Sequence, residues 1–154
     1  MTQEEFDQKF HELFSGMVQL AFEFVDNNEE EVDTIYIYVS MEESSDFYNV
    51  YYKINNSLTK IHEVNKVNKV SKKQYDTSMG RMMGVLRTGT GDASKTRSLF
   101  EAFEHEVPTQ MKMKYHPKTG KFDSDISYDL HYSNDPDKTT SDVFDEWFDG
   151  LKEL

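Results

Sequence analysis

The sequence predicts a single α+β domain in which one mostly antiparallel β-sheet is packed by N-terminal, middle and C-terminal helices. Three observations lead to this fold class. The chain opens with an apolar stripe at helical spacing, continues with β-branched and aromatic runs, and closes with an amphipathic segment that contains its single tryptophan. The 154 residues suffice for one compact core and contain no internal repeat, so we expect one domain over 1–154.

Residues 2–25 are predicted to form the first helix. Their apolar side chains, from Phe6 and Phe10 to Phe24 and Val25, recur at steps of three and four residues, which is the spacing of one buried helical face. Turn-forming and acidic residues at 26–33 then end the helix in a solvated loop.

Two strands are predicted next, at 34–41 and 47–54, because both runs are rich in β-branched and aromatic residues and only "EESSD" separates them. Such a short loop indicates antiparallel pairing. The first run is apolar on both faces, so we expect it to be central in the sheet. A third strand is expected within 55–65, paired through a turn at Asn55 and Asn56.

The segment 66–97 mixes basic residues and glycines with a weak helical patch, and it predicts a short helix followed by a flexible loop. Its stretch "GTGDASKT", at 89–96, differs from a phosphate-binding loop because Ser94 replaces the second glycine. The residues before it make a poor central strand, and antiparallel hairpins lack the crossover that directs a helix N-terminus at phosphate. We therefore expect a pliable connection to a further helix over 98–107, which Pro108 ends.

A hairpin is predicted over 110–132, where apolar and charged residues alternate with the two-residue period of strands. If the turn lies at 117–120, Lys114 faces Asp123 and Lys112 faces Asp125, two opposite-charge pairs that we expect on the solvent side. The alternation continues to Tyr132, which predicts a solvated His131 on the charged face.

The last helix is expected to begin in the hydroxyl cluster at 139–141. Phe144, Trp147, Phe148 and Leu151 would form its apolar stripe. The stretch from Asp135 to Glu146 has oxygen-bearing residues at several calcium-loop positions, but Thr140 stands where that loop needs glycine, so a helix cap is the preferred interpretation.

Charge is unevenly distributed along the chain, whose net charge is −12. Basic against acidic residues number 1 and 13 in residues 1–52, 10 and 3 in 53–97, and 6 and 13 in 98–154. An acidic protein is poorly suited to bind phosphate backbones, and it favours a basic partner. The candidate partner-binding residues are the acids of the last segment: Asp129, Asp135, Asp137, Asp142, Asp145, Glu146 and Asp149.

No catalytic, cofactor or metal motif occurs in the sequence, which has no cysteine and no metal-ligand spacing among its five histidines. We therefore expect no enzymatic activity, no cofactor and no metal. The acidic N-terminal stretch lacks the features of a signal peptide, and no apolar window is long enough to cross a membrane, which predicts a cytoplasmic protein without a membrane partner.

The hairpin "MKMKYHPKTGKFDSDISYDLHY" followed by the acidic, tryptophan-containing "SDVFDEWFDGL" resembles the YezG-like immunity proteins, antitoxins of bacterial polymorphic toxin systems. The likeness extends more loosely to the first helix and the first strand pair, and it gives no guide to 66–97. It implies a cytoplasmic protein that neutralises a cognate toxin domain, commonly a nuclease. A nuclease presents a basic cleft that acidic residues can occlude.

Two alternatives remain open at this point. One is a nucleic-acid-binding regulator that uses the basic residues Lys66, Lys69, Lys72, Lys73, Arg81 and Arg87. The other is a nucleotide-binding protein built on the degenerate loop at 89–96. The sequence does not fix the oligomeric state.

Overall fold

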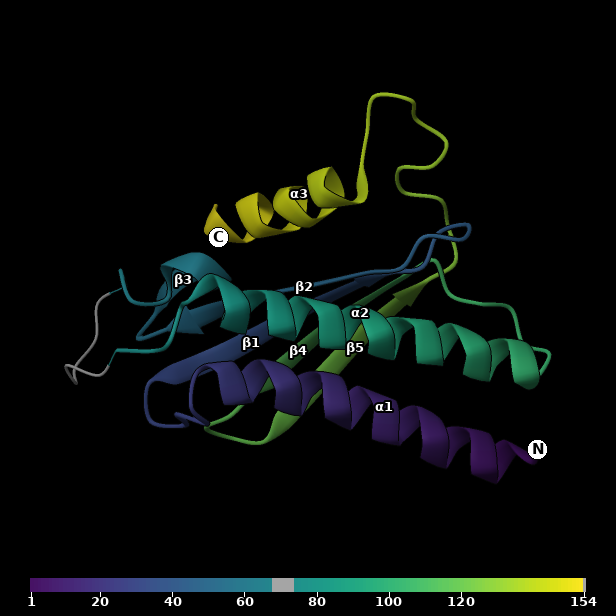
Figure 1. Ribbon diagram of the computed structural model, residues 1–154, viewed down its shortest axis with the longest axis horizontal. Coiled ribbons are helices and arrows are strands. Elements are labelled where there is room, and N and C mark those ends of the chain that lie inside the picture. The colour runs from purple at the N-terminus through teal and green to yellow at the C-terminus, as the bar shows by residue number, and fades with distance from the viewer. Residues whose placement is uncertain (68–73, 154) are drawn as a thin grey trace.

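The computed structural model describes residues 1–67 and 74–153 (Figure 1). Its elements are α1 (Gln3–Phe24), β1 (Val32–Ser40), β2 (Phe47–Ile54), β3 (Ser57–Lys60), a 3-10 turn (Ile61–Glu63), α2 (Met79–Ala102), β4 (Gln110–His116), β5 (Lys121–Ser127) and α3 (Thr140–Lys152). The strands form one antiparallel sheet in the order β3-β2-β1-β4-β5. This architecture confirms the predicted α+β class.

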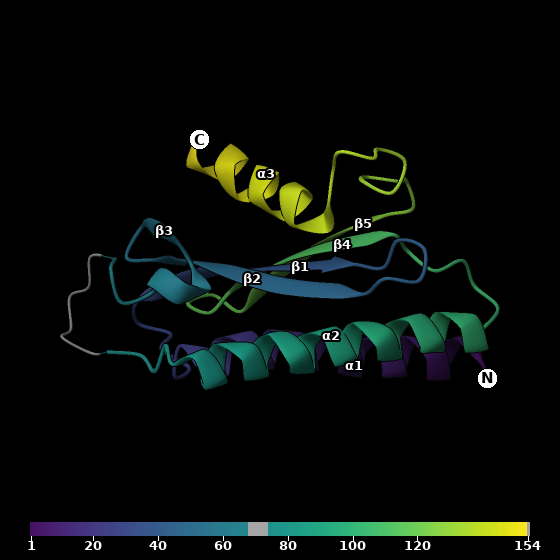
Figure 2. The ribbon, with the colours of Figure 1, turned by 45° about the horizontal axis from the view of Figure 1, so that its top comes forward.

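The molecule has three layers, with α1 and α2 side by side on one face of the sheet and α3 on the other (Figures 1 and 2). Strand β1 is central, as predicted, and it is buried on both faces. Ile35 and Ile37 belong to the large core beneath α1 and α2, whereas Tyr36 and Tyr38 belong to a second cluster with α3. One strand therefore contributes to two cores.

The predicted turn between β2 and β3 is confirmed at Asn55 and Asn56, which pair Ile54 with Ser57. Both asparagines have positive φ, 46° and 66°. Asparagine tolerates this left-handed conformation better than most residues.

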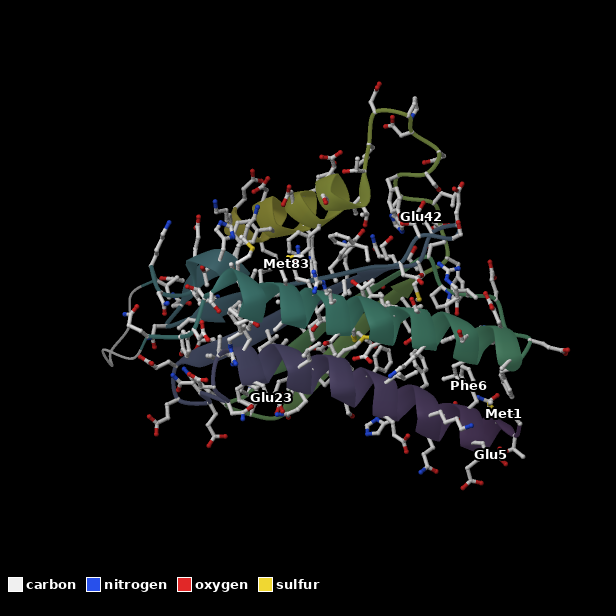
Figure 3. All side chains as sticks on the ribbon, in the orientation of Figure 1. Met1, Glu5, Phe6, Glu23, Glu42 and Met83 are labelled. Carbon is white, nitrogen blue, oxygen red and sulfur yellow. The ribbon has the colours of Figure 1, made fainter. Side chains whose placement is uncertain are left out.

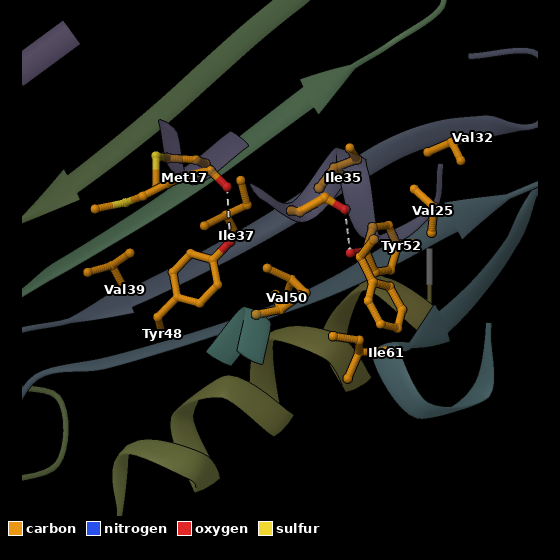
Figure 4. Packing of buried hydrophobic residues seen from close by; sticks show 14 of the residues in the cluster. Met17, Val25, Val32, Ile35, Ile37, Val39, Tyr48, Val50, Tyr52 and Ile61 are labelled. Atoms are coloured by element: carbon orange, nitrogen blue, oxygen red, sulfur yellow. Dashed lines mark hydrogen bonds between the residues drawn. The ribbon is translucent and has the colours of Figure 1, made fainter. Parts of the chain in front are cut away.

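Two tyrosines of β2 hold α1 against the sheet. The hydroxyl of Tyr48 donates to the carbonyl oxygen of Met17 at 2.9 Å, and that of Tyr52 donates to the carbonyl of Ala21 at 2.7 Å (Figure 4). Both rings are fully buried, so each hydroxyl needs a partner within the protein. The bonds therefore fix both the height and the register of α1 over the sheet.

The prediction of a flexible loop within 66–97 is wrong for 79–97, which belong to the continuous helix α2, whereas 66–67 and 74–78 lie outside helices and strands. Residues 68–73 of that segment lie outside the described part of the chain. The stretch "GTGDASKT" lies within α2, so its backbone N–H groups belong to the helical hydrogen-bond ladder and form no loop around a phosphate. Of the separate helix expected at 98–107, residues 98–102 are the end of α2, and residues 103–107 are not helical.

Gly89 lets α2 approach β2 closely. A Cβ atom built on Gly89 would overlap the ring of Tyr48, which has no room to move because it is buried and bonded to Met17. Gly91, on the other side of the helix, has open space around the same position. Glycine at 89 therefore serves packing between helix and sheet.

Further along α2, Arg97 fastens the helix to the β1–β2 loop. Its guanidinium forms an ion pair with Asp46 at 2.7 Å and donates to the carbonyl of Met41 at 2.7 Å. Ser94 donates to the same carboxylate at 2.8 Å. Both side chains of the ion pair are largely buried, so Arg97 has a structural role.

The β4–β5 hairpin has the predicted register: His116 pairs with Lys121, Lys114 with Asp123, and Lys112 with Asp125. The prediction fails after Ser127, where β5 ends. Residues 128–132 leave the sheet, and His131 hydrogen-bonds Ser127 Oγ through Nε2 at 2.9 Å. It is half-buried, not a solvated strand residue. The two-residue alternation of apolar and charged residues in the sequence therefore extends beyond the end of the strand.

We predict that Gly89→Ala lowers the free energy of unfolding by about 1–3 kcal/mol, because the added methyl group must displace the Tyr48 ring or the helix. Gly91→Ala is the matched control in the same helix, and it should raise the free energy of unfolding by up to about 1 kcal/mol through helix propensity. Urea unfolding of both variants measures the difference. Equal stabilisation by the two substitutions would contradict the close approach.

Candidate functional site

Helix α3 docks on a tyrosine surface of β1 and β2. The ring of Tyr51 lies 5.0 Å from that of Trp147, 5.2 Å from Phe148 and 5.5 Å from Phe144. Tyr36 stacks on Tyr51 at 4.5 Å and extends the surface. Aromatic packing of this kind fixes the rotation of the helix, so its opposite face must point to water. The predicted apolar stripe of α3 is thereby confirmed.

The start of α3 is fixed by a capping box. Thr139 Oγ1 accepts from the Asp142 backbone N–H, and the Asp142 carboxylate accepts from the Thr139 N–H at 2.8 Å. The preferred interpretation of this stretch as a helix cap is confirmed. Residues 140–146, the second half of the calcium-loop resemblance, are helical.

Glu42, which was not among the predicted site residues, holds the segment that leads from β5 to α3. Its carboxylate, 1% exposed, accepts from the backbone N–H groups of His131, Tyr132 and Ser133 and from the Ser133 hydroxyl at 2.7 Å. Glu42 lies beside this segment in Figure 3. Burial alone would raise the pKa of Glu42, but these hydrogen bonds outweigh it and lower the pKa. No local motif marks a carboxylate whose partners lie about ninety residues away.

The predicted binding acids occupy three places. Asp142, Asp145, Glu146 and Asp149 lie on α3, Asp135 and Asp137 lie in the segment before it, and Asp129 lies just after β5. All are exposed except Asp145, which is half-buried. From 128 to 153 the chain carries eight acids and two lysines, so this end of the molecule is strongly negative.

Three of these acids converge on Lys138. Its ammonium donates to Glu146 at 2.9 Å, and this bond, together with the charges of Glu146, Asp135 and Asp142, raises the pKa of Lys138. Like charges gathered around one lysine leave a net negative field. The structure thus brings Asp135, Asp142 and Glu146 together, whereas Asp129 lies in a different segment.

Some of the acids already have structural partners. Asp142 caps its helix, and Asp145 pairs with Lys60 at 3.0 Å. Within the described part of the chain, Asp129, Asp137 and Asp149 form no ion pair. These three carboxylates are therefore the ones most available to a partner, whereas Glu146 is exposed but paired with Lys138.

The hairpin adds acids that face α3. A hollow of about 280 Å³ lies between β4, β5 and α3, and Asp123, Asp125, Lys112, Lys114 and Trp147 line it. The Lys112 ammonium lies 5.3 Å from the Trp147 ring centre. Burial lowers the pKa of Lys112. The expected solvent position of the Lys112–Asp125 pair is thus wrong for the lysine, because α3 partly covers it.

The basic residues of the middle segment, 66–97, lie in different environments. Arg81 donates to the carbonyl of Glu23 at 2.8 Å and lies over the Phe24 ring, so it helps to join α2 to α1. Lys66 and Arg87 are exposed, and Lys69, Lys72 and Lys73 lie outside the described residues.

Neither the protein-family models nor the curated proteins compared with this sequence match it. Within the described residues, no helix combines the length and the apolar character needed to cross a bilayer. In the same part of the chain, no group of three or more histidine, aspartate or glutamate side chains is placed to hold a metal ion.

We predict that Glu42→Gln lowers the free energy of unfolding by about 2 kcal/mol near neutral pH, because charge-assisted hydrogen bonds to partly buried N–H groups are weakened. A lowered pKa in the folded state stabilises above the unfolded pKa and loses that effect in acid. The deficit of Glu42→Gln relative to the unmodified protein should therefore shrink as the pH falls below about 4.5.

Urea unfolding at a series of pH values measures this dependence, with the exposed neighbour Glu43→Gln as the matched control. A deficit that is unchanged in acid would show that the charge of Glu42 does not hold the segment.

Proposed function

We propose that this protein is a cytoplasmic immunity protein that binds a basic toxin domain, with a nuclease as the expected class, and blocks its cleft with acidic side chains. The observation that carries the proposal is the acidic surface built on α3, which presents Glu146 and Asp149 while its other side is locked on the tyrosine surface. The resemblance of the hairpin and the last helix to YezG-like immunity proteins adds to it. The proposal involves no catalysis.

The proposed binding depends on acidic residues that are carried by an ordered backbone. The capping box and the aromatic packing fix α3, and Glu42 fixes the segment that carries Asp135 and Asp137. Because the backbone that carries these acids is already ordered, little backbone entropy is lost when a partner binds. A concentrated negative field also speeds encounter with a basic protein and makes the association rate sensitive to salt.

The binding experiment uses the C-terminal toxin domain encoded beside the gene for this protein. We expect a complex with a Kd below micromolar in isothermal titration calorimetry. Absence of a complex at micromolar concentrations would refute the proposed function.

The surface is tested with the triple variant Asp137→Lys, Glu146→Lys and Asp149→Lys, which spares the cap at Asp142 and the ion pair at Asp145 but breaks the exposed pair of Glu146 with Lys138. We expect at least about tenfold weaker binding, mostly through a slower association rate, with the unfolding free energy changed little. The control reverses three exposed acids elsewhere, Glu29, Glu30 and Glu101, and should keep most of the affinity. If both variants bind equally well, the contact does not involve α3.

A further inference from the structure

Strand β5 forms one edge of the sheet. Among the described residues it pairs with β4 alone, and residues 121–125 are exposed. The strand has seven residues and no proline, whereas the opposite edge, β3, has four residues. An edge strand leaves backbone N–H and C=O groups without a strand partner, so another extended chain can pair with it. The side chains of β5 decide which chain fits.

The face of β5 that points toward α3 carries charges of both signs. Lys121, Asp123 and Asp125 lie on it, and Lys112 and Lys114 of β4 lie opposite the two aspartates. The two strands thus contribute three lysines and two aspartates to this face. A strand whose charges all had one sign would meet attraction at some positions and repulsion at others. This face therefore fits a strand that carries both signs in the matching order.

Strand β5 supplies that order when a second copy of it runs antiparallel. In pairing about Phe122, Lys121 of each copy lies opposite Asp123 of the other, which gives two opposite-charge pairs. Pairing about Asp123 would set Lys121 against Asp125 but bring the two Asp123 carboxylates together. Pairing about Ser124 would set Asp123 against Asp125 twice. Of these registers, the one about Phe122 has charge attraction without repulsion.

Asp123 is able to accept a cation from a second copy. It is exposed, and its ion pairs within the chain are long: 3.9 Å to Lys121 and 3.8 Å to His116. Along the described part of the chain, Lys121 has no closer ion pair than this one. Both charged groups can therefore pair between two copies without losing a short ion pair within one.

The opposite face of β5 offers an apolar contact at the same point. Phe122 is 39% exposed and lies 5.9 Å from Phe14, at a groove of about 310 Å³ beside α1. Directly opposite side chains of an antiparallel pair point to the same face. Pairing about Phe122 therefore brings the Phe122 rings of the two copies together at the two-fold axis and covers them.

The lining of this groove is uncharged apart from its histidine. Helix α1 contributes His11, Phe14, Ser15, Val18, Gln19 and Phe22, and the sheet contributes Tyr115 and Phe122. The net charge of the chain is −12, so two copies repel each other over most of their surfaces. The groove and the mixed charges of β5 form a surface where that repulsion is locally small.

We propose that two copies of this chain form a two-fold symmetric dimer by antiparallel pairing of β5 about Phe122, with Lys121 of each copy beside Asp123 of the other. The two sheets then join edge to edge, with both α3 helices on one face and both pairs of α1 and α2 on the other (Figure 2). Because β5 begins at Lys121, the new ladder covers residues 121–123 of each copy, which makes the dimer weak. The inference goes beyond the proposed function and does not depend on it.

Sedimentation equilibrium of the full chain from about 10 µM to about 1 mM measures the association. We expect a monomer–dimer equilibrium with a dissociation constant below about 1 mM. Amide shifts of the isotopically labelled chain should change on dilution along β5 and in the α1 residues that line the groove. A monomer at the highest concentration, or changes confined to α2 or α3, would overturn the proposal.

Charge exchange identifies the register. Lys121→Asp alone sets two acids against each other at both ends of the contact, so it should weaken the dimer at least about fivefold. Lys121→Asp combined with Asp123→Lys restores opposite charges at the original net charge and should recover most of the affinity. In the register about Asp123 the same exchange would leave two acids facing each other at positions 121 and 125, so a failure to recover would refute pairing about Phe122. The control Lys95→Asp, exposed on α2, changes the net charge as much as Lys121→Asp and should alter the affinity less than about twofold.

The apolar contact is tested with Phe122→Ala, which should weaken the dimer about tenfold because the ring lies at the centre of the interface. Tyr128→Ala is the matched control, since Tyr128 is 41% exposed but lies beyond the end of β5. Urea unfolding verifies that both variants stay folded. Equal weakening by the two substitutions would show general hydrophobic association and would rule out the proposed strand pairing.

Discussion

Strand β1 is enclosed on both faces, and the other elements are arranged around this constraint. Its isoleucines face the paired helices α1 and α2, while its tyrosines require a separate cover. Helix α3 supplies that cover and is held there by the rings around Tyr51. The orientation of the acidic residues is thus a consequence of burying aromatic surface.

Most of the fold follows from hydrophobic periodicity. The central position of β1 could be inferred from its two apolar faces, and the hairpin register from the pairs Lys114–Asp123 and Lys112–Asp125. The extent of α2 could not, because glycines and threonines lower helix propensity and tertiary packing compensates for it. The end of β5 was not predictable either, because the alternation in the sequence continues past Ser127. The segment that follows has already left the sheet and donates hydrogen bonds to Glu42.

The candidate site was only partly visible in the sequence. The acids of α3 follow from one amphipathic pattern, so their common outward face was predictable. The ion pair of Asp145 with Lys60 was not predictable, because the two residues are 85 positions apart in the sequence. The approach of the hairpin acids to Trp147 likewise depends on how α3 crosses the sheet, which no local pattern records.

The fit between Gly89 and Tyr48 also bears on how relatives of this chain would be recognised. Two positions 41 residues apart share one small volume, so a larger residue in the helix requires a smaller one on the strand. Related sequences should vary at these positions together, with their summed size conserved. This pair would then identify the fold in relatives that lack the glycine-rich sequence around Gly89.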